Sequence, residues 1–109
     1  MRYRILDTAD LEGRRKLIAR ELDARAVKLN QFDSEPHQEG FVHDESESGQ
    51  EEIYSALRGS GVLRVEGEEV PLEPGRYVLV GPEATRQVVA GPNGLSYAVV
   101  GAVVRAKET

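Results

Sequence analysis

Twelve residues near the middle of the chain hold most of its candidates for chemistry. The stretch from His43 to Tyr54, HDESESGQEEIY, contains one histidine, five carboxylates, a glutamine and a tyrosine, and no lysine or arginine. Imidazole and carboxylate groups can bind a divalent metal, or carry protons between an enzyme and its substrate. The same composition also suits an acidic loop in water. The stretch therefore predicts a metal site, a proton-transfer site or a solvated loop.

The remaining composition narrows these alternatives. The 109 residues include no cysteine, which excludes disulfides, thiolate metal sites and cysteine nucleophiles and leaves oxygen and imidazole ligands. A net charge of −5 argues against a nucleic-acid surface, because such surfaces neutralise phosphates with cations. No apolar run is long enough to cross a membrane, so we expect no membrane association and a cytoplasmic protein.

Charge is unevenly distributed along the chain. Residues 2 to 28 hold eight of the fourteen cations, whereas residues 33 to 52 hold eight of the nineteen acids and no lysine or arginine. One interpretation is a pair of solvated surfaces that attract each other, and the other is the mouth of an acidic pocket.

The elements that must position the twelve residues are mostly strands. From Glu52 onward, segments rich in Val, Leu, Ile and Tyr alternate with breaks that contain Gly or Pro, a pattern typical of consecutive short strands. We expect these strands at residues 52–57, 62–65, 69–72, 77–80, 86–89 and 95–104, with a hairpin around Gly67.

The first third of the sequence is less regular. Residues 2–6 alternate like an edge strand, Asp10 could cap a short helix that ends at Leu22, and residues 26–33 alternate again. Eight or more short antiparallel strands around one core close most economically as a jelly roll or barrel, and small molecules bind at the mouth of such a barrel. The sequence thus predicts one all-β domain over residues 1–109, with N-terminal strands and a short helix in residues 1–31 and the barrel core in residues 32–104.

From Glu52 onward the chain resembles the cupins, a family of small jelly-roll barrels with two motifs. The first motif is Gly, five residues, His-x-His, three or four residues, Glu, six residues and Gly. The second is Gly, five residues, Pro-x-Gly, two residues, His and, after three more, Asn. EIYSALRG (residues 52–59) has the Glu-to-Gly interval of the first motif, and GRYVLVGPEATR (residues 75–86) has the length of the second. The resemblance implies a double-stranded β-helix jelly roll over roughly residues 32–104. Because cupins commonly pair, it also implies a homodimer, with residues 2–6 as a strand that could cross to the second chain.

The ligand positions depart from the cupin pattern. Counting from Gly40 puts Ser46 and Ser48 where the motif has its paired histidines, and the fourth ligand position falls on Arg86. An arginine side chain has no lone pair to donate to a metal. Only Glu52 matches, so the standard metal site of the family is absent.

Two rearranged sites remain open at this point. A bulge before Glu52 would let His43, with Glu45, Glu47 or Gln50, approach Glu52 and bind Mn, Fe, Ni or Zn. Alternatively, Glu52 and Arg86 pair across the barrel.

The resemblance also predicts which side chains face a ligand. Its register points Gln50, Glu52 and Tyr54 into the barrel, on one face of a strand. We expect His43 and Glu52 to be catalytic, with Gln50, Tyr54 and Arg86 binding a small organic molecule. Arg86 would hold a carboxylate or enolate of that molecule.

Three functions fit these expectations. The first is a metal-dependent or acid/base enzyme of the isomerase, cyclase or oxygenase type that acts on a small organic anion. The second is a binding or sensing module without metal, and the third is a structural dimer with an unused cavity. Fold alone does not decide among them.

Overall fold

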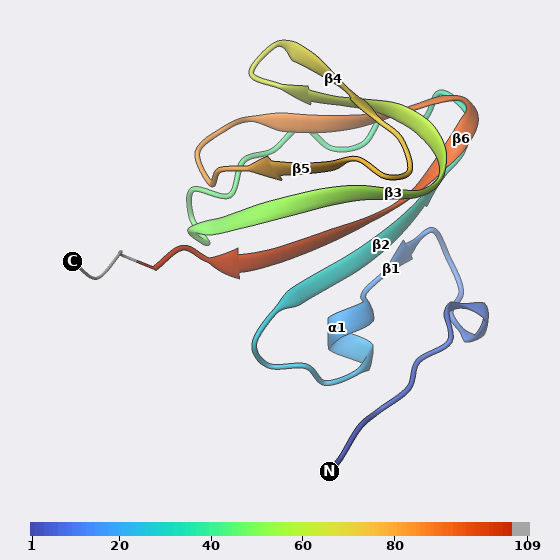
Figure 1. Cartoon of the computed structure of the whole chain (residues 1–109), viewed down its shortest axis with the longest axis vertical. Coiled ribbons are helices and arrows are strands. Elements are labelled where there is room, and N and C mark those ends of the chain that lie inside the picture. Colours follow the sequence, from blue (N-terminus) through green and yellow to red (C-terminus); the bar gives the residue numbers. More distant parts are fainter. Residues whose placement is uncertain (106–109) are drawn as a thin grey trace.

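A computed structural model describes residues 1–105, and these residues form one bent antiparallel sheet (Figure 1). Two long strands, β3 (Gln50–Val65) and β6 (Arg86–Val103), pair along most of their length and form its centre. β2 (Lys28–Ser34) adds to β6, and β1 (Arg15–Lys16) adds to β2. The fold class is all-β with a short helix, as predicted.

The long strands bend, so each belongs to both layers of the jelly roll. The first half of β3 pairs with β5 (Tyr77–Val80), and its second half pairs with β4 (Glu68–Leu72). The register between β3 and β6 shifts at Ala56/Arg58 and at Gly59/Gly61. A bulge at such a point increases the local twist and bends the strand. The two layers enclose a core that includes Leu63 and Leu72, both fully buried.

Glycine makes the bends possible without breaking the strands. Gly59 has φ +77°, and a Cβ there would lie 2.2 Å from the carbonyl oxygen of Gly94; a Cβ on Gly61 would lie 2.4 Å from that of Val89. The predicted breaks at residues 58–61 and 91–94 are therefore wrong. The predicted strands 52–57 and 62–65 are one strand, β3, and 86–89 and 95–104 merge in the same way into β6. A glycine that permits close backbone approach inside a strand has the same sequence signature as one that permits a turn.

The predicted hairpin and its neighbouring strands are confirmed. Between β3 and β4 the chain turns at Glu66 and Gly67, with φ of 49° and 83°. Positive φ at both central residues defines the type I′ turn, whose twist matches that of the flanking strands.

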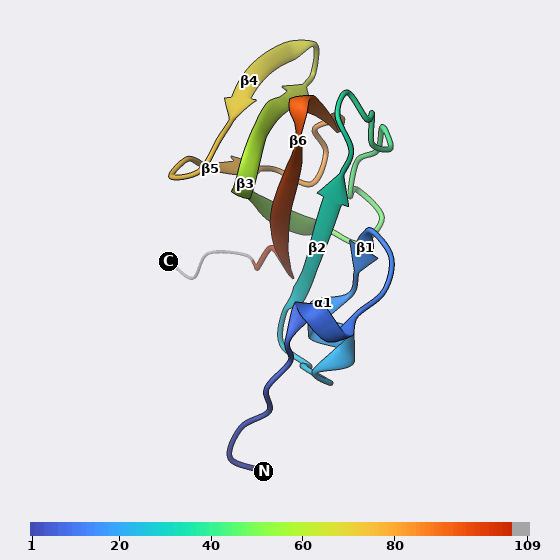
Figure 2. The ribbon, with the colours of Figure 1, turned by 90° about the vertical axis from the view of Figure 1, so that its right-hand side faces the viewer.

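The N-terminal region differs most from the sequence prediction. Residues 2–6 form no strand, and the helix predicted from Asp10 to Leu22 is wrong over most of its length. In its place lie a 3-10 turn, η1 (Thr8–Asp10), then β1, then the single-turn helix α1 (Ile18–Glu21). Gly13, at φ +82°, turns the chain between η1 and β1. Seen from the side, β1 lies beside the middle of β2, and α1 lies toward the start of β2 (Figure 2).

An ion pair between Lys16 and Asp33 fixes β1 against β2. Burial raises the pKa of the Asp33 carboxyl, but the hydrogen bonds from Lys16, Gln31 and Ser96, together with the charge of Lys16, hold that pKa below its usual range.

No helix in residues 1–105 is long and apolar enough to span a membrane.

Candidate functional site

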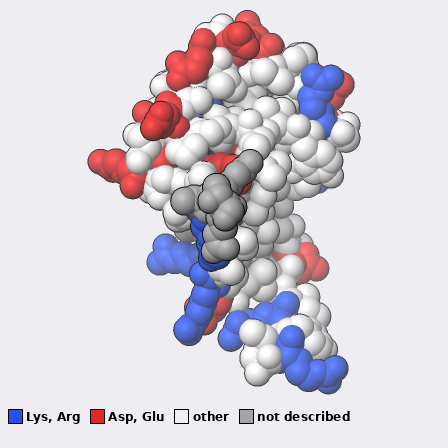
Figure 3. Space-filling view, turned by 60° about the vertical axis from the view of Figure 1, so that its left-hand side comes forward, with Lys and Arg blue, Asp and Glu red and all other residues white. Residues whose placement is uncertain are grey.

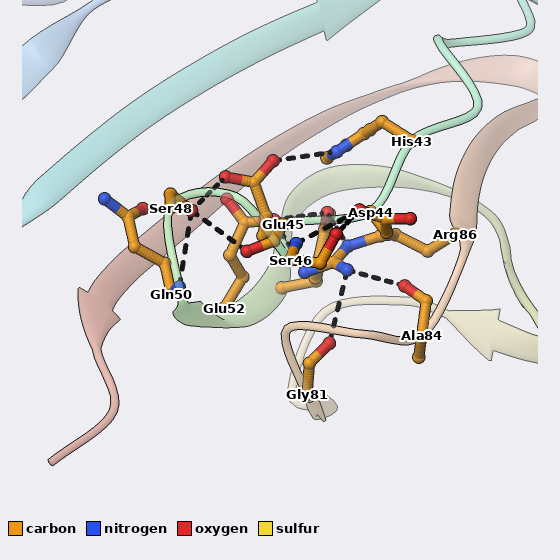
Figure 4. A network of polar contacts seen from close by, with 11 residues as sticks. His43, Asp44, Glu45, Ser46, Ser48, Gln50, Glu52, Gly81, Ala84 and Arg86 are labelled. Atoms are coloured by element: carbon orange, nitrogen blue, oxygen red, sulfur yellow. Dashed lines mark hydrogen bonds and ion pairs between the residues drawn. The ribbon is translucent and has the colours of Figure 1, made fainter.

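Glu52 and Arg86 form an ion pair inside the barrel. Nη2 of Arg86 donates to Oε1 of Glu52 at 3.1 Å, and the two side chains are 0% and 8% exposed. Nη1 of Arg86 also donates to the carbonyl oxygens of Gly81 (3.2 Å) and Ala84 (2.6 Å), as Figure 4 shows. With Nε directed at the hydroxyl of Tyr54 at 3.4 Å, four of the five guanidinium N–H groups have acceptors. Arg86 is thus fixed within the protein rather than left for a ligand.

Tyr54 completes this buried network. Its hydroxyl donates to Oε1 of Glu52 at 3.0 Å. Burial, followed by the charge of Glu52, raises the pKa of Tyr54 well above its usual value, so the hydroxyl keeps its proton and remains a donor. Both side-chain bonds to Glu52 end on Oε1, and no hydrogen bond from the described residues ends on Oε2. Oε2 is therefore the carboxylate oxygen left for another partner.

His43 enters the site through backbone pairing with β6. Its N–H donates to the carbonyl of Arg86 at 3.0 Å, and the N–H of Arg86 donates back at 2.8 Å. Residues paired in this way across antiparallel strands have side chains on the same face. Nδ1 of His43 lies 3.0 Å from Oε2 of Glu45, and the hydroxyl of Ser48 donates to the other oxygen of Glu45 at 3.0 Å.

A tight turn over residues 46–49 makes this arrangement possible. Asp44 accepts bonds from the backbone N–H (3.0 Å) and the hydroxyl (2.7 Å) of Ser46, and these bonds lower the pKa of Asp44. The N–H of Gly49, at φ +68°, donates to the carbonyl of Glu45 at 2.8 Å. The turn excludes Ser46 and Ser48 from the positions that residue counting gave them. His43 and Glu45 lie beside Glu52 instead, and each of the three offers one ligand atom within 4.8 Å of the others.

Two other predicted site residues lie apart from this cluster. Glu47 is exposed in the turn, outside the group of three. Gln50 is on the inner face of β3 beside Glu52, but it does not line the cavity described below. Its Oε1 is buried and has no hydrogen-bond partner within residues 1–105. Gly101 makes room for it, because a Cβ there would lie 2.9 Å from that oxygen.

The cluster opens on a cavity of about 570 Å³. Its wall includes a row of aromatic rings: the centroids of Phe32 and Tyr97 are 5.2 Å apart, and those of Tyr54 and Tyr97 are 6.4 Å apart. Burial, then the charge of Glu52, raises the pKa of Tyr97 to about 12. The cavity thus has an apolar wall and a polar end with His43, Glu45 and Glu52.

Three cations that line the cavity were not predicted as site residues: Arg14, Arg15 and Lys28. Arg15 pairs in register with Phe32, and Lys28 pairs with Gly101, so both lie on the sheet face that bears the aromatic row. Neither has an ion-pair partner in the described part of the chain, whereas Arg14 pairs with Glu35. The sequence did contain a signal for Lys28. The alternating pattern of residues 26–33 predicts a strand, and a strand places Lys28 on the same face as Phe32.

Comparisons with known proteins agree with this architecture. No protein-family model matches the sequence, and no curated protein matches it. Among solved structures, a cupin protein from Bacteroides fragilis has a TM-score of 0.82 at 22% identity, over 100% of this chain and 91% of that one. An RmlC-like cupin from Desulfovibrio desulfuricans has a TM-score of 0.69 at 20% identity, over 81% and 79% of the two chains.

Enzymes are also among the similar structures. A salicylate 1,2-dioxygenase from Pseudaminobacter salicylatoxidans has a TM-score of 0.64 at 14% identity; the match covers 71% of this chain and 21% of the enzyme. At these identities the likeness concerns the fold alone.

Proposed function

This chain has the cupin fold, and from that premise we propose that its cavity binds a small organic anion on which His43 and Glu45 carry out proton transfer. The observation that carries the proposal is the opening of the His43, Glu45 and Glu52 cluster on a cavity of about 570 Å³. A cavity of that size suits a small organic molecule, and apolar walls with a few convergent polar groups are typical of ligand sites.

The anionic group of the ligand is held at the cationic side of the cavity. Arg86 also lines the cavity, but its buried side chain already donates to Glu52 and to backbone carbonyls, so we assign the anionic group to other cations. Arg15 and Lys28 line the same cavity and are both exposed. Arginine pairs with carboxylate through two parallel hydrogen bonds, and lysine adds a point charge.

The proton chemistry follows from the pairing of His43 with Glu45. An ionised carboxylate only accepts hydrogen bonds, so the 3.0 Å contact requires the proton of the imidazole on Nδ1. In the neutral imidazole the other ring nitrogen, Nε2, then carries the lone pair; it accepts a proton from one atom of the ligand and returns it to another. Ser48 holds Glu45 in place, and Oε2 of Glu52 accepts a hydrogen bond from a ligand hydroxyl. The reaction class is isomerisation or cyclisation by proton transfer.

A divalent metal is the second candidate, because one donor atom from each of His43, Glu45 and Glu52 lies within 4.8 Å of the others. Mixed nitrogen and oxygen donors suit Mn, Fe, Ni or Zn. Those three residues would hold the ion, and it would supply Lewis-acid catalysis, or oxygen chemistry in an enzyme of the oxygenase type. Against it, the Arg86 guanidinium lies 3.1 Å from Glu52, and its charge weakens the binding of a second cation there.

A ligand screen tests the proposal. Thermal shift with a panel of small mono- and dicarboxylates should give at least one stabilising acid, because a ligand stabilises the state that it binds. The shift should be lost in the double variant Arg15→Gln, Lys28→Gln. Arg76→Gln removes one positive charge from an exposed position outside the cavity and should keep the shift. A panel without any stabilising acid would contradict the proposal.

Two further measurements separate the candidates. Elemental analysis of protein purified without chelator should find no stoichiometric metal; one equivalent that is lost in Glu45→Gln would favour the second candidate. If an acid binds, hydrogen exchange into it should be faster with the protein than with His43→Gln. Binding without exchange would leave a sensing or carrier role.

A further inference from the structure

The hydroxyl of Tyr97 is a hydrogen-bond donor that has no role in the site as described so far. Tyr97 is 7% exposed and lines the cavity. The hydroxyl of Tyr54 donates to Glu52, whereas that of Tyr97 forms no hydrogen bond with any residue from 1 to 105. Within the same residues, Oε1 of Gln50 is the sole side-chain polar atom that is fully buried without a partner. The Tyr97 hydroxyl is therefore open to the cavity and lacks an acceptor.

This hydroxyl lies beside the segment that leads to His43. A Cβ on Gly40 would lie 3.9 Å from the hydroxyl oxygen of Tyr97, and Gly40 itself lines the cavity. Burial and the charge of Glu52 raise the pKa of Tyr97 to about 12, so the hydroxyl keeps its proton at neutral pH. A donor that is removed from water without an acceptor costs free energy, and an oxygen atom of a ligand would remove that cost.

Tyr97 shares one row of the sheet with a cation and a second aromatic ring. Arg15 of β1 pairs in register with Phe32 of β2, and Phe32 pairs with Tyr97 of β6, so the three side chains lie on one face. Neighbouring strands are about 4.8 Å apart, which separates the backbones of Arg15 and Tyr97 by roughly 10 Å. The ring of Phe32 lies between them. A ligand that contacts both ends of this row is therefore apolar in its middle.

Another aromatic ring is exposed at the cavity. Phe41 lines the cavity and is 89% exposed, so most of its ring has no partner within the described chain. Aromatic rings gain most when they pack against flat apolar groups, stacked or edge to face. A flat apolar ligand would contact Phe32 and cover part of Phe41.

The distribution of charge determines which end of the ligand carries its carboxylate. Residues 1–28 hold eight cations and five acids, a net charge of +3, and residues 29–105 hold five cations and thirteen acids, a net charge of −8. On the face in Figure 3 the cations lie mainly toward the N-terminal end and the acids mainly over the barrel. Arg15 belongs to the cationic part, whereas Glu45 and Glu52 line the cavity from the acidic part. A second carboxylate on the ligand would be repelled there.

We propose that the ligand is a flat, apolar monocarboxylic acid with an uncharged oxygen opposite its carboxylate, and that the hydroxyl of Tyr97 donates a hydrogen bond to that oxygen. The proposal rests on the proposed function, because it names the class of anion that the cavity holds. The carboxylate contacts Arg15, the flat body packs on Phe32, and the second oxygen accepts from Tyr97. Tyr97 thus selects among acids that the cations alone would hold equally well.

Two acids of equal charge and similar size test the hydrogen bond. 4-Acetylbenzoate has a carbonyl oxygen where 4-isopropylbenzoate has a methyl group. Isothermal titration calorimetry should find that the wild type binds 4-acetylbenzoate about fivefold more tightly, the effect of one net hydrogen bond. In Tyr97→Phe the two acids should bind equally. The hydroxyl has no partner in residues 1–105, so this variant should fold. Tyr77→Phe makes the same change at an exposed tyrosine outside the cavity and should keep the preference.

Two further acids test the ligand class. Terephthalate replaces the acetyl group with a second carboxylate, and pyruvate has both oxygen groups without the flat apolar body. Each should bind at least tenfold more weakly than 4-acetylbenzoate.

The outcomes separate this inference from the proposed function. Equal affinity of the wild type for the acetyl and isopropyl acids, or a preference that persists in Tyr97→Phe, would overturn the role of Tyr97. Terephthalate or pyruvate binding as tightly as 4-acetylbenzoate would overturn the ligand class and leave the proposed function standing, because a carboxylate still binds. If no carboxylate binds, both proposals are wrong.

Discussion

At the scale of single residues, Arg86 determines what this site can do. It stands at the fourth ligand position of the cupin motif, yet its side chain is fully buried and donates to Glu52, Tyr54 and two backbone carbonyls. A guanidinium in that position contributes positioning and charge, and no lone pair. Chemistry at the site therefore depends on His43 and Glu45, with Glu52 held by its partners.

Removing Arg86 should destabilise the fold. Arg86→Met leaves Glu52 buried without its cation and removes the donors to two carbonyls, so the free energy of unfolding should fall by about 3–5 kcal/mol, measured by urea denaturation. Arg86→Met with Glu52→Gln should recover part of the loss, because the unpaired charge is gone. A loss below about 1 kcal/mol in the single variant would show that the pair does not have this role.

Tyr97 should make stability fall at high pH. Its pKa is raised to about 12, chiefly by burial, from a reference of 10.0. The folded state holds this proton more tightly than the unfolded state, so the stabilisation is complete below pH 10 and is lost as pH rises from 10 to 12. Denaturation of the wild type and of Tyr97→Phe at pH 9 to 12 measures the difference. Over this pH range the free energy of unfolding of the wild type should fall by on the order of 2 kcal/mol more than that of Tyr97→Phe. Equal falls in the two proteins would contradict the raised pKa of Tyr97.

Residue counting located part of this site. The pairing of Glu52 with Arg86 was one of two alternatives that followed from the motif register, and the structure contains it. The count also placed Ser46 and Ser48 at the positions of the paired histidines. That placement was wrong, because counting residues takes no account of the turn that excludes both serines. The sequence did contain a signal for this turn, at Asp44, Ser46 and Gly49. A short polar side chain such as that of Asp44 accepts a hydrogen bond from the backbone two residues on, which favours a turn.

At the scale of elements, two bent strands bring the site together. β3 and β6 pass from one layer to the other through glycines at which a side chain would clash with a carbonyl. The register implied by the cupin resemblance predicted the inner face of β3, where Glu52, Tyr54 and Ala56 are buried. It could not predict that the chain continues through residues 58–61 as a strand, since the requirement for glycine there comes from backbone that lies far away in sequence.

Substituting a bend glycine should cost far more than substituting a turn glycine. Gly59→Ala requires a side chain at φ +77° and 2.2 Å from the carbonyl oxygen of Gly94, so the free energy of unfolding should fall by at least about 3 kcal/mol. Gly81→Ala is the control, because no atom lies within 4 Å of its Cβ and its φ is not positive. Thermal or urea denaturation should find Gly81→Ala within about 0.5 kcal/mol of the wild type. Equal losses in the two variants would contradict this view of the bends.

At the scale of the whole molecule, the barrel and the N-terminal region cooperate in forming the cavity. The barrel supplies the polar end and most of the aromatic row, while β1 and the start of β2 supply the cations Arg15 and Lys28. Sequence analysis predicted the barrel from strand spacing and turn residues. It predicted neither Arg15 nor Lys28 as a cavity residue. A helix was predicted over residues 10–22, so the short strand that places Arg15 beside Phe32 was missed.

The central claim is that a small carboxylate enters this cavity and meets His43, and NMR of the two histidine side chains tests it most directly. His43 lines the cavity, and His37 lies in an exposed turn and serves as an internal reference. Titration with the carboxylate that gives the largest thermal shift should move the imidazole signals of His43 and leave those of His37 in place. Arg15→Gln with Lys28→Gln should weaken that response at least tenfold. A carboxylate that binds without moving the signals of His43 would contradict the account.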